Sequence, residues 1–382
     1  MSTPVLTAPA ALPVAERSLA PDLARGAMLL LIAVAHAHMY LSYDDAGFRG
    51  YALDGAPLDR LVAGVQILFV DGRALPMFAA LFGYGLARLT ARRPDPAEAR
   101  RVVRRRGLLL LAFGFAHALL LFFGDILAAY GIVALLFAGM LRRGDRALLR
   151  AAALTIPLHV LVLALLGLAT VTGGHAPSPT VIADPLEAVG MRLAVWSAMT
   201  PTFFLVSALP TFFLGVWAGR RRVLDDPAAH RPFLRRVAVA GIAIGVLGGL
   251  PLTAVDLGVW APADGVSIGA YALHSVAGIA AGAGYAALAG LFAARTSPPG
   301  RVARALAACG QRSLTCYVLQ SVAFTVIFTP FVLGLGDDVG DAAASGIAVA
   351  VWLSTVLVAV ALERAGSRGP LESLLRRLTY GR

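Results

Sequence analysis

Apolar runs of about 20 residues recur along the whole chain, and a helix of that length crosses the hydrocarbon core of a bilayer. Only 14% of the residues are charged, whereas a soluble domain carries roughly 25%. Because no water reaches the backbone inside a bilayer, the chain must satisfy its polar groups within helices. The sequence therefore predicts an all-α polytopic membrane protein and argues against a soluble protein with a very large core.

Ten membrane-spanning helices are predicted, one at each apolar run. The expected spans are 23–42, 61–90, 104–123, 125–141, 147–171, 202–219, 235–254, 268–294, 312–334 and 341–362. Residues 1–20 are rich in Ala and Pro and are expected to form a disordered tail before a single transmembrane domain, residues 21–382. A long external loop without a strong pattern is expected at 172–201.

The arginines indicate the orientation of the chain. All 33 basic residues are arginines, and the expected spans place nearly all of them on one face of the membrane. Arg49, Arg60 and Arg192 lie on the other face. By the positive-inside rule both termini are predicted to be cytoplasmic, in a multi-pass protein of the cell membrane. This distribution assigns the net charge of +11 to orientation and contact with lipid headgroups, so no nucleic-acid partner is expected.

The second span is expected to be broken, because it is too long for one perpendicular helix and the segment VDGRALP interrupts it. This segment contains Asp71, Gly72, Arg73 and Pro76, and proline removes a backbone donor and kinks or breaks a helix. We expect an interfacial segment near 58–70 and a shorter crossing through 75–89. Broken backbone at this depth is tolerated where it lines a cavity or is buried in protein.

Small residues crowd two of the expected spans, at GIAIGVLGG (241–249) and GIAAGAGYAALAG (278–290). Such stripes let helix backbones approach closely inside a membrane. We therefore assign them to helix packing and give them no catalytic meaning.

Ionisable side chains inside the apolar runs are the candidate functional residues. His36 lies within the first span, eleven residues after Arg25, so the two share one helix face about 16 Å apart. The third span repeats the spacing with Arg106 and His117, and Asp125 follows. An ionisable group at this depth costs on the order of 3 kcal/mol, so it usually faces protein or a water-filled cavity.

Six ionisable groups are expected in the outer half of the membrane: His36, Asp71, Arg73, His117, Asp125 and His274. Their similar depth on different helices predicts that they line one polar cavity. The alternative for each histidine is an interhelical hydrogen bond worth about 0.6 kcal/mol. We favour that alternative for His38, His159 and His274. Asp71 and Arg73 can equally well neutralise partners on other helices.

A further polar cluster, GQRSLTCYVLQS, opens the ninth span. Ser313, Tyr317 and Gln320 share one helix face and can bridge helices or bind the polar arm of a ligand. The cytoplasmic arginines, among them Arg105 and Arg106, act first as topology determinants, although the guanidinium fork is also a favoured phosphate ligand. The sequence contains no motif that predicts a metal site.

Five motifs spread over most of the chain are DLARG at 22–26, LFGYG at 81–85, G-x-x-H followed by GDIL at 114–127, GQRSLTCYVLQS at 310–321 and GPLESLLRRLTYG at 369–381. Together they resemble the YeiB-like membrane proteins, a family with domain of unknown function 418. This resemblance implies a polytopic membrane protein and does not assign a reaction.

The D-x-x-R-G start, with His36 fourteen residues after Asp22, is similar to the first span of transmembrane acyltransferases. These include sugar O-acetyltransferases and the lysosomal heparan-glucosaminide N-acetyltransferase. The resemblance implies transfer of an acyl group from cytoplasmic acyl-CoA, such as acetyl-CoA, to an envelope glycan or lipid. It implies His36 or His117 as general base, oriented by Asp125 or Asp71. The donor would be bound by Arg25, Arg73, Arg105 and Arg106, with Ser313, Tyr317 and Gln320.

Two other functions stay open. A transporter or permease would use the same polar cavity as a path for a solute or a proton, because intramembrane histidines and carboxylates serve that role equally well. A non-catalytic membrane protein is the third hypothesis. The sequence is compatible with a homodimer and does not specify the acceptor.

Overall fold

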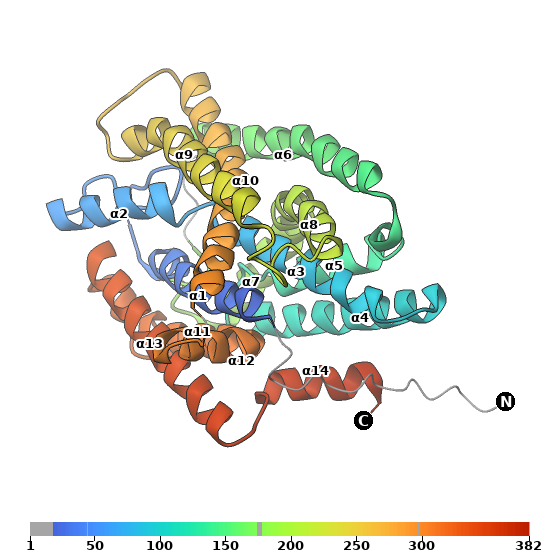
Figure 1. Ribbon diagram of the computed structural model, residues 1–382. Helices are drawn as coiled ribbons and strands as arrows, with labels where there is room; N and C mark the ends of the chain where they lie inside the picture. Colours follow the sequence, from blue (N-terminus) through green and yellow to red (C-terminus); the bar gives the residue numbers. More distant parts are fainter. Residues whose placement is uncertain (1–17, 44, 174–177, 297, 382) are drawn as a thin grey trace.

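The computed structural model describes residues 18–43, 45–173, 178–296 and 298–381, and over these residues the chain forms an all-helical bundle (Figure 1). The predicted all-α class is therefore confirmed. Of the expected disordered tail, residues 1–17 lie outside the described residues, and the first helix begins at Leu19. The α-helices are α1 (Leu19–Ala37), α2 (Pro57–Phe69), α3 (Ala74–Ala91), α4 (Pro96–Leu120), α5 (Leu127–Phe137), α6 (Asp145–Gly173), α7 (Pro185–Met199), α8 (Leu205–Arg220), α9 (Arg231–Asp256), α10 (Asp264–Arg295), α11 (Arg301–Gln311), α12 (Ser313–Phe328), α13 (Asp341–Arg364) and α14 (Pro370–Tyr380).

Seven helical runs among the described residues are long and apolar enough to cross a membrane, which supports a multi-pass protein. They are Leu19–Tyr40, Pro57–Ala91, Asp145–Gly173, Pro185–Arg220, Arg231–Asp256, Asp264–Arg295 and Asp341–Arg364. The other three expected spans coincide with α4, α5 and α12. Helices α5 and α12 have only 11 and 16 residues, and arginines fill much of the first half of α4. The count of ten spans and the cytoplasmic termini stay predictions.

The predicted break in the second span is confirmed. Helix α2 ends at Phe69 and α3 begins at Ala74, with Gly72 between them in the left-handed region at φ 68°. The carbonyl of Gly72 packs directly on Gly278 of α10, so α10 presses on the broken backbone. This contact fixes the break against a neighbouring helix, as irregular backbone inside a membrane requires.

Replacing Gly72 by alanine is expected to lower the free energy of unfolding by about 1 kcal/mol or more, because a side chain strains left-handed backbone. The added methyl would also lie 3.2 Å from Cε1 of His274. Thermal unfolding in detergent micelles measures the effect. The control is Gly190→Ala, at a helical position where an added Cβ meets nothing within 4 Å. An unfolding temperature lowered equally in both variants would contradict the prediction.

The expected loop at 172–201 is wrong over much of its length, because it contains α7. The side chain of Asp184 accepts hydrogen bonds from Leu186 N at 2.9 Å and Glu187 N at 2.8 Å, and Pro185 occupies the first turn. Helix α7 then continues through a π-helical turn into α8. The capping signal is visible in the sequence, but hydropathy alone does not reveal it.

The glycine stripes pack α9 against α10, as predicted. Gly241 meets the backbone of Ala280, and a Cβ at Gly245 would lie 2.5 Å from Cβ of Ala281. In the centre of the bundle, α1 contacts α3, α10, α11, α12 and α13 (Figure 1). Gly26 of α1 meets the backbone of α11 with no room for a side chain. Helix α1, which carries Arg25 and His36, is therefore held rigidly by its neighbours.

Candidate functional site

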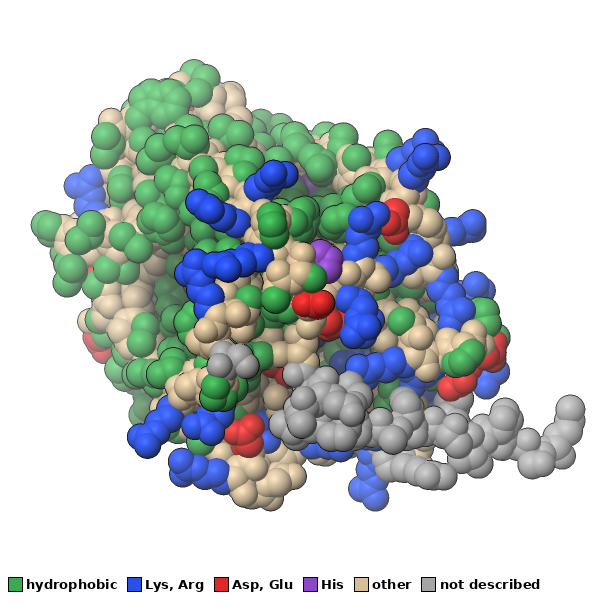
Figure 2. Space-filling view, in the orientation of Figure 1, with side chains coloured by type: hydrophobic (Ala, Val, Ile, Leu, Met, Phe, Trp, Pro, Cys, Tyr) green, Lys and Arg blue, Asp and Glu red, His purple; other side chains and the backbone are tan. Residues whose placement is uncertain are grey.

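A cavity of about 270 Å³ lies where α1 and α12 begin, among helices that carry many arginines. We call it the arginine cavity. Its charged lining residues are Asp22, Arg25, Arg106 and Glu372. Arg25 donates to Asp22 at 3.0 Å and keeps a quarter of its side-chain surface exposed. Figure 2 shows a face of the molecule on which arginine side chains far outnumber acidic ones. The cavity therefore offers guanidinium groups that an anionic ligand can reach.

A second cavity of about 250 Å³ lies farther along α1, and we call it the histidine cavity. Its polar lining residues are His36, His38, Arg49, Asp71, His159, Ser207, Tyr271 and Ser275. The remaining lining is apolar and aromatic, with Phe48, Phe122 and Phe203 among its members. Such a mixture of apolar walls and a few polar groups is typical of small-molecule sites.

Tyr317 and Ile126 lie between the two cavities. Ile126 lines both of them. Tyr317 lines the arginine cavity, and its ring centroid lies 6.3 Å from that of His36, which lines the histidine cavity. The ring of Tyr317 also lies 4.9 Å from that of His117. The two histidines predicted from the repeated spacing therefore both lie near the ring of one tyrosine.

His36 lines the histidine cavity and is partly exposed. Its ring packs on Phe122 at a centroid distance of 4.6 Å and lines the histidine cavity. Within the described part of the chain, neither of its ring nitrogens makes a hydrogen bond to protein. A partly exposed imidazole with uncommitted nitrogens can accept a proton from a ligand placed in that cavity.

His117 is buried and lines neither cavity. Its Nε2 lies 2.8 Å from Oγ of Ser321, and its Nδ1 lies 3.2 Å from Oδ1 of Asp125. The other oxygen of Asp125 accepts a hydrogen bond from Ala128 N at 2.8 Å, at the start of α5. Asp125 and His117 are therefore brought together as the resemblance implies, and they join α4, α5 and α12 behind Tyr317.

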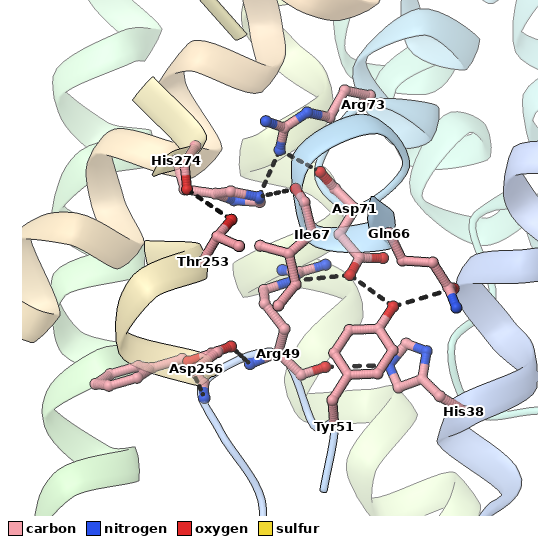
Figure 3. A network of polar contacts seen from close by, with 12 residues as sticks. His38, Arg49, Tyr51, Gln66, Ile67, Asp71, Arg73, Thr253, Asp256 and His274 are labelled. Atoms are coloured by element: carbon pink, nitrogen blue, oxygen red, sulfur yellow. Dashed lines mark hydrogen bonds and ion pairs between the residues drawn. The ribbon is translucent and has the colours of Figure 1, made fainter. Parts of the chain in front are cut away.

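Asp71 does not contact His36. Its Oδ2 accepts a 2.8 Å hydrogen bond from the hydroxyl of Tyr51 and lies 3.7 Å from Nε of Arg49 (Figure 3). Burial and the nearby carboxylate of Asp71 raise the pKa of Tyr51 well above its ordinary value, so the phenol stays a proton donor. Burial opposes the charge of Arg49, but Asp71 together with Tyr271, Tyr51 and Asp256 outweighs this effect and raises the pKa of the guanidinium. The side chain of Asp71 thus completes a buried ion pair.

The loop between α1 and α2 brings Arg49 and Tyr51 to this ion pair. The backbone N–H groups of Phe48 and Arg49 both donate to Asp256 at 2.9 Å, and His38 Nε2 lies 3.0 Å from the carbonyl of Arg49. The ring of His38 stacks on that of Tyr51 at 4.1 Å. These contacts close the loop over one side of the histidine cavity (Figure 3). His38 makes a structural bond, as favoured from the sequence.

Arg73 lies apart from both cavities and is completely buried. Its guanidinium donates to the carbonyl of Asp71 at 2.5 Å, to Gly245 O at 2.7 Å and to Nε2 of His274 at 2.5 Å. The same Nε2 lies 2.8 Å from the carbonyl oxygen of Ile67, so the ring of His274 sits between the guanidinium of Arg73 and the last turn of α2. Arg73 joins α3 to α9 and α10, a structural position that differs from the predicted role of donor binding.

The ionisable groups that were predicted to line one polar cavity lie in separate parts of the structure. His36 and Asp71 line the histidine cavity, whereas the pairs His117–Asp125 and Arg73–His274 are buried beside it. Of the predicted donor-binding residues, the structure places Arg25, Arg106, Ser313 and Tyr317 on the arginine cavity. Arg105 is exposed at the surface, and Gln320 is buried and lines neither cavity.

Sequence reasoning missed Arg49, Tyr51 and Glu372. The sequence did mark Arg49 as unusual, because it is one of only three arginines expected on the membrane face that carries few of them. Glu372 of α14 accepts hydrogen bonds from Leu314 N at 2.8 Å and Thr315 N at 3.0 Å, and so caps α12 at the arginine cavity. Among the described residues, no group of three or more His, Cys, Asp or Glu side chains is placed to hold a metal ion.

Comparisons with known proteins support the resemblance drawn from the motifs. Residues 218–382 match the sequence model of the family described as "Protein of unknown function (DUF418)". The Uncharacterized protein YxaH of Bacillus subtilis (strain 168) is 26% identical over 386 residues, covering 92% of this chain and 90% of the relative. The Uncharacterized protein YeiB of Escherichia coli (strain K12) is 27% identical over 389 residues, covering 95% and 96%. The chain is therefore similar to the DUF418 family over residues 218–382, and to YxaH and YeiB over nearly its whole length.

Proposed function

We propose that the protein is an integral-membrane acyltransferase that moves an acyl group from cytoplasmic acyl-CoA to a hydroxyl or amine of an envelope glycan or lipid. The observation that carries this proposal is the pair of cavities that share Ile126 as a lining residue, with Tyr317 of the arginine cavity 6.3 Å from His36 of the histidine cavity. One cavity carries arginines and the other a histidine with uncommitted nitrogens. A donor and an acceptor could therefore approach one reaction point from opposite sides of the bundle.

The donor would enter the arginine cavity. Arg25 and Arg106 would bind the phosphates of coenzyme A, because guanidinium groups pair with two phosphate oxygens at once. The lining between these arginines and Tyr317 includes Phe78, Phe82 and Leu110, which suits the uncharged arm of the donor. The acidic Asp22 and Glu372 are already engaged, by Arg25 and by the first turn of α12. The thioester would thus reach Tyr317.

The acceptor would occupy the histidine cavity, with its hydroxyl or amine beside His36. His36 would take the proton of this group as its oxygen or nitrogen attacks the thioester carbonyl. The new ester or amide bond forms as the carbon–sulfur bond breaks, and the proton on the imidazole passes to the departing thiolate of coenzyme A. His117 and Asp125 would act as positioning residues, since the ring of His117 packs on Tyr317 and Asp125 pairs with His117.

A transporter remains the second candidate. The observation that favours it is the buried Asp71–Arg49 pair on the wall of the histidine cavity, where a solute could exchange for either partner. Solute flux in proteoliposomes that disappears in Asp71→Asn, together with absence of acyl transfer, would support this function in place of the enzyme.

The enzyme is tested by supplying purified protein with labelled acetyl-CoA and extracts of envelope lipid and glycan. We expect transfer of the label and a weakened Kd for acetyl-CoA in Arg25→Ala and Arg106→Ala. Loss of one charge-assisted contact is worth about 1.5–3 kcal/mol, which corresponds to roughly a 10- to 100-fold weaker Kd. The matched control is Arg105→Ala, an exposed neighbour outside the cavity. Failure of the unmodified protein to bind acetyl-CoA would overturn the proposed function.

A further inference from the structure

A third cavity of about 250 Å³ lies between α3, α8, α9 and α10, apart from the histidine cavity. We call it the apolar groove. Its lining exposes no polar surface and includes Leu81, Trp217, Leu224, Phe233, Val237 and Ala286. It lies at the ends of these helices that carry Arg88, Arg220, Arg231 and Arg295. The groove is therefore on the arginine-rich side of the bundle.

Water is a poor occupant of this groove, because a buried water needs two to four polar partners and the lining offers none. Hydrocarbon is the fitting occupant. Near the groove, Val239 of α9 and Leu288 of α10 are 66% and 44% exposed, as expected of side chains that face lipid tails. Trp217 and Phe233 pack edge to face at 6.0 Å on the lining, and aromatic side chains of this kind gather at headgroup depth.

Three consecutive arginines follow the apolar part of α8, and two of them are engaged with Asp145. Arg221 donates to Asp145 at 2.8 Å and lies over the ring of Trp217 at 5.1 Å, while Arg220 lies 3.7 Å from the same carboxylate. Arg222 differs, because 65% of its side chain is exposed.

The acidic neighbour of Arg222 is already paired with another arginine. Oδ2 of Asp225 lies 2.7 Å from Nε of Arg88 but 3.6 Å from Nε of Arg222. The charge of Arg222 is therefore available to an anion.

The backbone of Arg222 is strained. At φ 57° it is the one residue other than glycine with a positive φ in the described part of the chain. Such a conformation costs an L residue of order 1–3 kcal/mol, and glycine would relieve it. Arg222 directly precedes Val223 and Leu224, which line the groove. Arg222 thus has a strained backbone, an exposed side chain and an apolar groove next to it. This combination indicates that its side chain binds a ligand.

We propose that the apolar groove binds one acyl chain of an anionic phospholipid whose phosphate is held by Arg222. The exposed Arg231 at the start of α9 adds to the positive charge at this end of the groove. The hydrocarbon lining selects a chain, and the guanidinium selects an anionic headgroup. The groove is separate from the histidine cavity and shares only Leu81 with the described lining of the arginine cavity.

Trp217 makes the site measurable, because bromine on a lipid chain quenches a tryptophan in contact with it. The full chain is reconstituted in phosphatidylcholine vesicles that contain a small fraction of chain-brominated phosphatidylglycerol or, in parallel, chain-brominated phosphatidylcholine. The difference in quenching between the unmodified protein and Trp217→Phe isolates the signal of Trp217, which lines the groove. We expect several-fold stronger quenching of Trp217 by the brominated phosphatidylglycerol.

Two variants separate the headgroup from the chain. Arg222→Gly removes the charge and relaxes the backbone, so the preference for phosphatidylglycerol should disappear while the unfolding temperature does not fall. Ala286→Phe fills the groove, so quenching by both lipids should be lost. Arg301→Ala removes an exposed charge elsewhere and should leave the preference intact. Equal quenching of the unmodified protein by both lipids, or a preference that survives Arg222→Gly, would overturn the proposal. Absence of quenching by either lipid would also overturn it.

Discussion

Replacing His36 by alanine is expected to lower the rate of acyl transfer by about 10²- to 10⁴-fold, the usual contribution of a general base. The binding of acetyl-CoA should be unchanged, because His36 lines the histidine cavity and not the arginine cavity. Since its ring nitrogens make no hydrogen bond to described residues, the variant should also keep the unfolding temperature of the parent. Initial rates with labelled acetyl-CoA and a saturating acceptor extract measure the effect.

Two further variants test whether a loss of rate in His36→Ala is specific to His36. His230→Ala removes a histidine from the turn between α8 and α9, outside both cavities, and should leave the rate unchanged. His117→Ala should reduce the unfolding temperature as well as the rate, because it removes the buried contacts to Ser321 and Asp125. A His36→Ala enzyme with the parent rate would reject His36 as the base while leaving the acyltransferase proposal open.

Replacing Arg73 by leucine is expected to destabilise the protein by about 3 kcal/mol or more, because buried acceptors that lose a donor cost roughly 1–3 kcal/mol each. The guanidinium is fully buried and donates to Asp71 O, Gly245 O and His274 Nε2. All three acceptors would be left without it. Thermal unfolding in detergent micelles should show the largest loss of any single arginine variant described above.

Arg73→Lys tests whether geometry or charge matters at this position. The ammonium keeps the charge but lacks the planar fork that reaches three acceptors, on the α2–α3 break, α9 and α10, so most of the stability should still be lost. Arg105→Leu, at an exposed position on α4, should change the unfolding free energy by less than about 0.5 kcal/mol. If Arg73→Leu unfolded at the parent temperature, the assigned hydrogen bonds would not stabilise the α2–α3 break.

The candidate site was only partly predictable from the sequence. Helical periodicity places Arg25 and His36 on one face and repeats the pattern for Arg106 and His117, and both arginines indeed line one cavity. Periodicity does not reveal which of the two histidines lines a cavity. His36 lines a cavity, whereas His117 is covered by Tyr317, Ser321 and Asp125. Asp125 follows His117 closely in the sequence, but Tyr317 and Ser321 come from α12, and their approach depends on packing between distant segments.

The sequence by itself determined the helical class, the broken second span and the packing of α9 on α10, because apolar length, the VDGRALP segment and the glycine stripes act locally. Only the tertiary structure decided the partners of the buried charges. Asp71 pairs with Arg49 from a loop, and Arg73 reaches His274 on a helix far along the chain. A buried charge is stable only with a partner supplied by another element, so its role becomes known only when the helices are assembled.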